Sequence, residues 1–358
     1  MNQGNIEAVG GGGIKREKIC HNISKKIISL ENLFLAWQEF RRGKRKKLDV
    51  QQFEFNLEDN LFQLHRDLKN KTYQHSHYIP FYIQDPKLRL IHKASVRDRV
   101  LHQAVFRTLY PIFEKVFIFD SYSCRLNKGT HRAVNRLEKF CRRLSKNHCK
   151  NTFALKCDIK KFFNSVAQDI LLKLIKKKIQ DKDTVWLLEK IIKSFEGEKS
   201  KALPLGNVTS QLFANIYLNE LDQFIKHKLK VKYYLRYCDD FVILGENKEY
   251  LIKLLPLIDN FLKEKLDLTL HLDKIIIRKH RQGIDFLGYI SFPHYRLLRT
   301  KTKRRIFRKM EKKNKELQQN KISKESFNHT IQSYLGLLKH CNSFKIQKEL
   351  KTKIYEKV

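Results

Sequence analysis

The sequence lacks a hydrophobic run long enough to cross a membrane. Its longest stretch without a charged residue spans 202–219 and contains Pro204, Gly206 and several amide and hydroxyl side chains, which a bilayer helix would avoid. The first residues also lack the apolar segment of a secretory signal. We therefore expect a cytoplasmic protein that has no membrane among its partners.

Paired metal-binding cysteines are also missing. The seven cysteines are scattered, and no two of them form the Cys-x-x-Cys spacing of a zinc or redox motif. This pattern indicates reduced thiols in an intracellular protein and excludes a disulfide framework. The nearest metal-like pair, His75 and His77, has no further ligand beside it, so we interpret it as part of a surface strand.

Acidic residues are scarce relative to basic ones. Lys and Arg total 74 and Asp and Glu total 37, which gives a formal net charge of +37. Hydrophobic residues make up 42% of the 358 residues, enough for a large folded core. Because the cations are spread along the chain, they favour a nucleic acid over a membrane surface as partner, although Lys-rich surfaces also serve solubility.

Hydrophobic periodicity predicts a mixture of helices and strands. We expect strands in a hairpin over 78–91, at 153–158, in a second hairpin over 232–244, and at 268–271, 275–278 and 286–292. We expect helices from residue 30, at 57–68 and 96–109, two between 158 and 201, one capped by Thr209 or Ser210, one near 251–262, and helical structure over 299–358. The order from 153 to 278 resembles a β-α-β-β-α-β split sheet with helices on one face and the other face open to a ligand.

Three acidic residues are placed where this sheet would bring them together. Asp158 ends the first strand, and Asp239 and Asp240 lie at the tip of the second hairpin. Aspartates are also ordinary turn formers, so the adjacent pair alone is ambiguous. If the three carboxylates meet at one edge of the sheet, they suit two Mg²⁺ ions, with Mn²⁺ as a substitute. Phosphate-binding candidates are the cations Lys87, Arg89 and Lys274.

Five motifs over residues 80–340 resemble those of reverse transcriptases, in the same order. They are Lys87-Leu88-Arg89 with 96–99, Asp158 to Phe163, Leu203 to Gln211, Tyr237-Cys238-Asp239-Asp240, and Asp285-Phe286-Leu287-Gly288-Tyr289. The resemblance implies an α+β right-hand polymerase that copies RNA into DNA from dNTPs, template RNA and a primer. It divides the chain into an N-terminal extension (1–56, flexible at the Gly10–Gly13 run), fingers (57–150), palm (151–295, with the helical segment 164–202 partly in the fingers) and thumb (296–358).

The same resemblance implies roles for individual residues. Metal ligands would be Asp158, Ile159, Asp239 and Asp240, of which the three acids are catalytic. Nucleotide contacts would come from Lys87, Arg89, Phe162, Phe163, Leu205, Gly206, Gln211 and Lys274. Nucleic-acid contacts would come from Arg97, Arg99, Tyr237, Gly288, Lys303, Arg304 and Arg305. Phe163 would lie beneath the incoming sugar, where a bulky ring excludes a 2′-hydroxyl, unless it is simply a core aromatic.

The loop around Leu205 distinguishes subfamilies. Leu205 stands where retroviral and intron-encoded enzymes carry Gln, and Gln211 where they carry Pro, which is similar to the enzymes of diversity-generating retroelements. That resemblance implies low-fidelity cDNA synthesis opposite adenine and a small basic accessory protein. An aliphatic side chain cannot hydrogen-bond as Gln does, which would lower discrimination, unless Leu205 simply packs. An antiphage defence reverse transcriptase and a catalytically silent RNA-binding protein remain alternatives.

Overall fold

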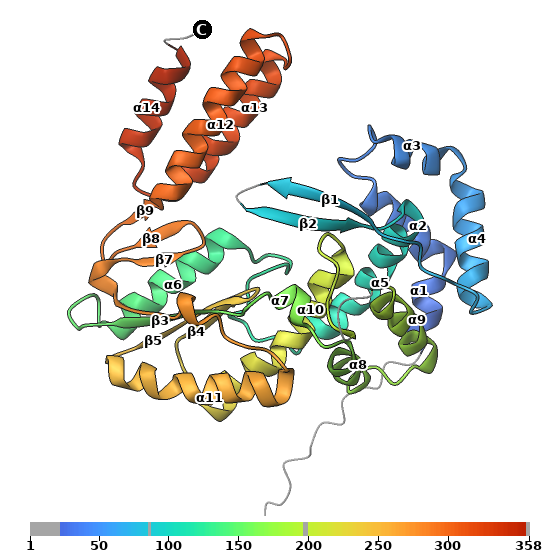
Figure 1. Cartoon of the computed structure of the whole chain (residues 1–358), viewed down its shortest axis with the longest axis horizontal. Coiled ribbons are helices and arrows are strands. Elements are labelled where there is room, and N and C mark those ends of the chain that lie inside the picture. The colour runs from blue at the N-terminus through green and yellow to red at the C-terminus, as the bar shows by residue number, and fades with distance from the viewer. Residues whose placement is uncertain (1–21, 85–86, 196–199, 356–358) are drawn as a thin grey trace, which may run out of the picture.

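The computed structural model describes residues 22–84, 87–195 and 200–355 (Figure 1). The Gly10–Gly13 run, Cys20 and the predicted turn at Asp85-Pro86 lie outside these residues. The described chain has three parts in Figure 1: a helical body with a projecting hairpin, a four-stranded sheet with helices, and a helical bundle above a small second sheet.

The helical body is built around α5 (Val96–Glu114), the predicted basic helix, which runs five residues longer than its apolar pattern indicated. Ser95 caps it by accepting a hydrogen bond from the Asp98 backbone N–H. Around it lie α1 (Ile23–Ile28), α2 (Leu30–Phe40), α3 (Leu48–Phe55), α4 (Leu57–Lys69), α8 (Gln168–Lys176) and α9 (Lys182–Lys193). Their buried apolar faces form one continuous core, which extends to one face of the central sheet.

The predicted first hairpin is confirmed as two antiparallel strands, β1 (Ile79–Gln84) and β2 (Leu88–Lys93). Every side chain of β1 is exposed, and so is the first half of β2. The hairpin projects from the helical body toward the side of the bundle (Figure 1). Since a two-stranded ribbon is marginal by itself, its base depends on neighbouring packing.

The central sheet has the predicted split β-α-β-β-α-β topology. Its strands are β3 (Phe153–Asp158), β4 (Tyr234–Tyr237), β5 (Asp240–Gly245) and β6 (Ile276–Lys279), in the order β4-β5-β3-β6. All three pairings are antiparallel, and β3 lies beside β5 as expected. On one face lie α10 (Val208–Gln223), which continues as a π-helical turn (Phe224–Lys228), and α11 (Lys248–Leu266).

The expectation that the second face is open is wrong over much of its area. Helix α6 (Thr130–Leu144) lies across it and packs on β4 and β5, on the opposite side from α11 (Figure 1). The apolar stripe of α6, which includes Val134, Leu137 and Phe140, meets Leu235 and Val242 of the sheet. The apolar positions of this helix fit one helical face, so its periodicity was a signal for it in the sequence.

Three predicted elements have different boundaries. Residues 268–271 form only a single bridge, Ile159 to Leu270, followed by a 3-10 turn at Leu272–Lys274. The strand expected over 286–292 is a hairpin of β7 (Ile284–Phe286) and β8 (Tyr289–Ser291), joined to β9 (Arg296–Leu298). The hairpin reverses at Gly288, which has φ 90. Helix α10 begins at Val208, so neither Thr209 nor Ser210 is its cap.

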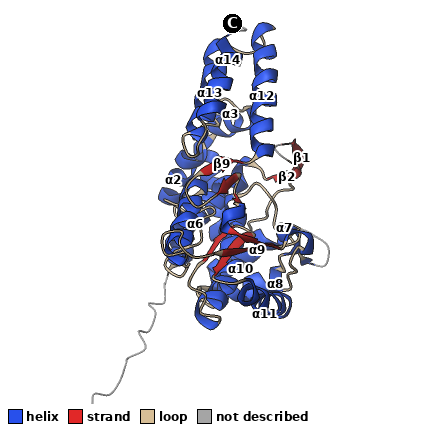
Figure 2. Cartoon of the chain, turned by 90° about the vertical axis from the view of Figure 1, so that its left-hand side faces the viewer, coloured by secondary structure: helices blue, strands red, loops and turns tan. Residues whose placement is uncertain are grey.

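The C-terminal segment is helical, as predicted. Helices α12 (Thr300–Gln318), α13 (Lys324–Leu338) and α14 (Phe344–Tyr355) stand above the small β7–β8–β9 sheet (Figures 1 and 2). The narrow stripe of Ile306, Phe307 and Met310 is buried together with Phe327, Ile331 and Leu338. Among the described helices, none combines the length and the apolar character that a bilayer crossing requires.

Candidate active site

The backbone brings Asp158 and Asp240 together. They are register partners at the ends of β3 and β5, the two inner strands of the central sheet. Directly opposed residues of an antiparallel pair point to the same face, with Cβ atoms about 4.5–5.5 Å apart. Asp239 precedes Asp240 in the β4–β5 turn, and its carbonyl accepts the Ile159 N–H at 3.3 Å. The acids therefore cluster at the strand ends, and not on an edge strand of the sheet.

Burial and mutual repulsion raise the pKa of two of these carboxyls. Desolvation raises the pKa of Asp240 to about 6, and the Asp158 charge adds to the rise while Lys156 opposes it. Desolvation followed by repulsion from Asp158 also raises the pKa of Asp239. The Oδ1 atom of Asp240 is buried without a hydrogen-bond partner. The cluster thus holds more negative charge than its surroundings neutralise.

Two lysines supply part of that neutralisation. The Lys156 ammonium lies 3.3 Å from Asp240 Oδ2, and the Lys274 ammonium forms an ion pair with Asp158. Lys274 was predicted as a phosphate contact, and it lies beside the acids. Lys156 was missed, although a period of two places it on the same strand face as Asp158. The two-residue spacing between Lys156 and Asp158 was the signal in the sequence that places Lys156 near the acids.

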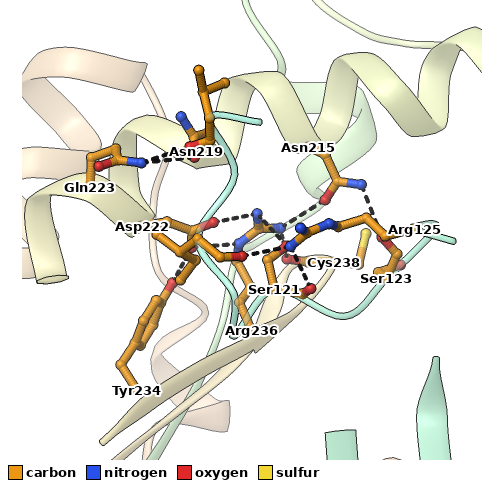
Figure 3. Close-up of polar contacts among 12 residues, drawn as sticks. Ser121, Ser123, Arg125, Asn215, Asn219, Asp222, Gln223, Tyr234, Arg236 and Cys238 are labelled. Carbon is orange, nitrogen blue, oxygen red and sulfur yellow. Dashed lines mark hydrogen bonds and ion pairs between the residues drawn. The ribbon is translucent and has the colours of Figure 1, made fainter. Parts of the chain in front are cut away.

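A buried arginine, Arg236, supports the turn that carries Asp239. Cys238 has φ 56, a left-handed conformation that a non-glycine residue adopts only when its surroundings fix it. Arg236 Nη1 donates to the Cys238 carbonyl at 3.0 Å. Figure 3 shows the Arg236 guanidinium surrounded by oxygen acceptors from three segments of the chain.

The principal partner of Arg236 is Asp222 on α10. Arg236 Nε and Nη2 donate to the two carboxylate oxygens at 2.8 and 2.6 Å, and both side chains are fully buried. The Tyr234 hydroxyl donates to the same carboxylate at 2.6 Å. Sequence reasoning missed this pair. The signal in the sequence was an acidic residue, Asp222, within the apolar face of α10 and a basic residue, Arg236, among the apolar and aromatic residues of β4.

The two adjacent phenylalanines lie on α7 (Phe162–Ser165), a single helical turn after β3, and not on a strand end. Phe162 is buried against the core, and Phe163 is partly exposed, with the ring centroids 5.3 Å apart. The Phe163 carbonyl accepts the Leu203 N–H at 2.7 Å. This bond ties the 203–207 loop to the segment that follows Asp158.

The same loop also contacts the projecting hairpin. The Leu205 carbonyl accepts the His92 N–H at 3.0 Å. Gly206 has φ +113, and a Cβ there would meet Ile91 Cγ2 at 2.8 Å. Glycine is therefore required by close contact with β2. Gln211 is exposed one turn into α10, whereas Asn207 is buried.

The predicted cations on the hairpin and on α5 differ in their surroundings. Lys87, just before β2, and Arg89, in its outer half, are exposed. Arg97 forms an ion pair with Asp67 at 2.5 Å, and Arg99 forms one with Asp49 at 2.6 Å. These two ion pairs join α5 to α4 and to α3.

The remaining predicted nucleic-acid contacts lie at the end of β4, on the β7–β8 turn and on α12. Tyr237 pairs with Asp240 across the β4–β5 turn and accepts a hydrogen bond from Thr130 at 3.3 Å. The Gly288 carbonyl accepts the Arg299 N–H, which joins the turn to the start of α12. On α12, Lys303 lies 3.1 Å from Glu349, Arg304 is exposed and Arg305 is half-buried.

No ready-made metal constellation is present among the residues that the structure describes. Within them, no group of three or more His, Cys, Asp or Glu side chains is arranged around a common point. The donor chemistry nevertheless fits a hard cation, because the acids are oxygen ligands and one buried Asp240 oxygen lacks any partner.

Comparison with known proteins gives the family. The sequence profile described as "Reverse transcriptase (RNA-dependent DNA polymerase)" matches residues 83–291, more than half of the chain. These residues include the three acids, the 203–207 loop and the β7–β8 turn.

Curated relatives are similar at low identity. The "Putative COX1/OXI3 intron 2 protein" of Saccharomyces cerevisiae is 22% identical over 77% of this chain and 39% of its own length. "Protein YkfC" of Escherichia coli is 26% identical over 59% of this chain and 65% of its own. "Group II intron-encoded protein LtrA" of Lactococcus lactis is 28% identical over 49% and 30%. The chain thus spans less than two thirds of the length of each of these relatives.

The chain is also similar to solved structures. The apo telomerase of Candida tropicalis aligns with a TM-score of 0.46 and 13% identity, over 62% of this chain and 48% of that one. The profile match alone covers enough of the sequence to assign the family. The chain belongs to the reverse transcriptase (RNA-dependent DNA polymerase) family.

Proposed function

We propose that the chain is an RNA-directed DNA polymerase whose centre is the acid cluster of Asp158, Asp239 and Asp240. The observation that carries this proposal is the direct register pairing of Asp158 with Asp240 beside the turn that bears Asp239. A protein has little reason to keep three partly desolvated carboxylates together unless they bind cations. This favours catalysis over a silent RNA-binding role.

The acid cluster would hold two Mg²⁺ ions, with Mn²⁺ as a substitute, and the Ile159 carbonyl would serve as an additional ligand. The unpartnered Asp240 oxygen and the raised pKa of Asp239 and Asp240 support this assignment. Such ions, when bound, make a 3′-hydroxyl more acidic and neutralise charge on the transferred phosphate.

Residues of the chain itself would position the nucleotide. Lys87 and Arg89, exposed on the projecting hairpin, would contact the triphosphate, because charge-assisted bonds to phosphate oxygens stabilise the developing charge. Phe163, partly exposed on α7 directly after β3, would exclude a ribose 2′-hydroxyl. Lys274 would exchange its contact with Asp158 for a phosphate. Leu205, Gly206 and Gln211 would border the same nucleotide, with Phe162 as support for Phe163.

The right-hand arrangement follows from this assignment. The hairpin and helical body would be the fingers, the central sheet the palm, and α12–α14 the thumb. Template RNA, primer and cDNA would lie between them. Their contacts would be Arg97 and Arg99 of α5, Tyr237, Gly288 and the α12 cations Lys303, Arg304 and Arg305. Lys303 lies near Glu349, so binding would compete with that ion pair.

The biological setting that we propose is a diversity-generating retroelement in the cytoplasm. Leu205 supports it, because an aliphatic side chain at the loop offers no hydrogen bond to template or substrate. The scattered cysteines support the location. A small basic accessory protein would act with the enzyme.

Primer extension tests the polymerase proposal. Purified protein with an annealed RNA template, DNA primer, dNTPs and Mg²⁺ should extend the primer, and Asp239→Asn should reduce extension by at least about a thousandfold, on the scale of losing one major transition-state stabiliser. Asp59→Asn makes the same chemical change on the exposed surface of α4 and should keep full activity. An Asp239→Asn protein as active as wild type would refute the assignment.

Sequencing the cDNA tests the retroelement proposal. Errors should concentrate opposite template adenines, and Leu205→Gln should reduce them because the amide restores a hydrogen bond. An even error spectrum that Leu205→Gln leaves unchanged would contradict the retroelement role and leave a defence enzyme as the better description.

A further inference from the structure

A cleft lies at the end of the central sheet opposite the acids. Its volume is about 1050 Å³, and it is lined by the end of α6, the β8–β9 loop and the turn between α13 and α14. It adjoins the start of β3, since His280 in its lining donates its backbone N–H to the Thr152 carbonyl at 2.8 Å. Five residue steps of β3 separate Phe153 from Asp158, which places the two sites about 17 Å apart along the strand.

The cleft carries positive charge that the described protein does not neutralise. Lys139, Arg142 and Lys339 line it and are exposed, and no carboxylate in the described part of the chain forms an ion pair with them. The acid in the lining, Glu138, is already bound by Arg296 through two hydrogen bonds of 2.6 and 2.5 Å. The three cations therefore favour a polyanion as occupant.

An aromatic pair stands in the same lining. Phe292 and Tyr295, at the two ends of the β8–β9 loop, stack with centroids 4.8 Å apart and an angle of 22° between their planes. Tyr295 is 49% exposed, so one side of the stack is available to a further planar group. Base stacking on aromatic side chains is a principal source of affinity in single-stranded nucleic-acid sites.

The lining also contains one buried polar atom without a partner, and a run of left-handed residues lies beside it. His280 is 3% exposed, and its Nε2 atom is buried without a hydrogen-bond partner. Lys146, Asn147 and His148 have φ of 48, 60 and 72, three consecutive left-handed residues, of which the last two line the cleft. Asn and His adopt this conformation more readily than most residues, so the unfavourable position is Lys146.

We propose that this cleft binds a single-stranded segment of RNA at a site separate from the polymerase centre. Lys139, Arg142 and Lys339 contact successive phosphates, and a base stacks on Tyr295. The amide groups of Asn135 and Asn147 border the cleft and can donate to a 2′-hydroxyl, which RNA alone provides. An acidic peptide would use the cations and leave the aromatic stack without a function.

Fluorescence anisotropy with a short labelled oligouridylate tests the site. Tyr295→Ala should weaken binding about tenfold, whereas Tyr295→Phe, which keeps the ring, should bind as wild type. Replacing Lys139, Arg142 and Lys339 by Gln should lower the slope of log affinity against log salt by about 2, since each lost phosphate contact accounts for about 0.7. The matched control removes three exposed lysines from α11: Lys248, Lys253 and Lys265.

A crosslinking experiment and two other ligands give results that could overturn the proposal. An oligouridylate containing 4-thiouridine should crosslink to peptides around Tyr295 and Arg142 on irradiation. Crosslinks confined to other regions would overturn the proposal, and so would equal binding of oligothymidylate or equal competition by oligoglutamate. An unchanged salt slope in the triple Gln variant would overturn it as well.

Primer extension separates this proposal from the polymerase assignment. The triple Gln variant should extend a short annealed template–primer at the wild-type rate while binding oligouridylate weakly. Asp239→Asn should show the reverse pattern. Loss of extension in the triple variant, with unchanged thermal unfolding, would mean that the cleft belongs to the polymerase centre and that the separate site is wrong.

Discussion

Replacing Asp222 removes the charge that neutralises Arg236 in the interior. Both side chains are fully buried, and the pair is bidentate with bonds of 2.8 and 2.6 Å. Breaking a buried ion pair by removing one partner costs about 3–5 kcal/mol, because the remaining charge is desolvated and uncompensated. We therefore expect Asp222→Ala to lower the free energy of unfolding by about 3–5 kcal/mol, a large share of the 5–15 kcal/mol typical of a domain.

Urea unfolding followed by tryptophan fluorescence measures this loss. The double variant Arg236→Met with Asp222→Leu removes both charges and should recover much of the stability, since apolar side chains of similar volume replace a buried pair with little loss. Polymerase activity should fall in the double variant, because it loses the bond from Arg236 to the Cys238 carbonyl that supports the turn before Asp239. Asp222→Ala keeps Arg236 and removes only the carboxylate that anchors its guanidinium.

The exposed pair of Lys193 and Glu189 is the matched control. Its atoms lie 2.6 Å apart, as in the buried pair, but the side chains are 53% and 39% exposed. Glu189→Ala should change the free energy of unfolding by less than about 1 kcal/mol. If Asp222→Ala falls in the same range, the pair does not support the turn as described, and the reasoning is refuted.

Three further predictions concern other parts of the molecule. Phe163→Ala should allow incorporation of ribonucleotides in primer extension, and continued rejection of them would remove the proposed steric role. Gly206→Ala should destabilise the protein by about 1–3 kcal/mol in thermal unfolding, because Gly206 has φ +113 and the added Cβ would lie 2.8 Å from Ile91 Cγ2. A neutral effect would mean that the loop shifts freely. Burial, followed by repulsion from His75, lowers the pKa of His102 to about 3. In the unfolded state the His102 side chain binds its proton near pH 6.5, so the contribution of neutral His102 to stability is full above about pH 6.5 and is lost as pH falls toward about 3. His102→Leu should therefore flatten the slope of the free energy of unfolding against pH over that window. An unchanged slope would contradict this assignment.

The sequence by itself determined the topology of the central sheet and the approach of its acids. Apolar runs ending in Asp158 and flanking Asp239-Asp240 indicate strands and a tight turn, and these signals are local because alternation and turn chemistry lie within a few residues. The strand 275–278 and the helical C-terminal segment were likewise predictable from short windows. The motif order also pointed to the family that the profile match confirms.

Only the tertiary structure decided which charges meet. Lys156 on β3 contacts Asp240 diagonally on the neighbouring strand β5, and the register of strand pairing sets this contact. Arg236 on β4 contacts Asp222 on α10, and the docking of that helix on the sheet sets this one. Spacing along the sequence sets neither. Arg97 and Arg99 are a further example, since the motif to which they belong says nothing of the ion pairs that folding gives them with Asp67 and Asp49. A side chain's type limits its possible partners, but the fold selects among them. The proposed RNA-binding cleft is defined by four segments, 135–148, 280, 292–296 and 339–342, that meet only in the folded chain.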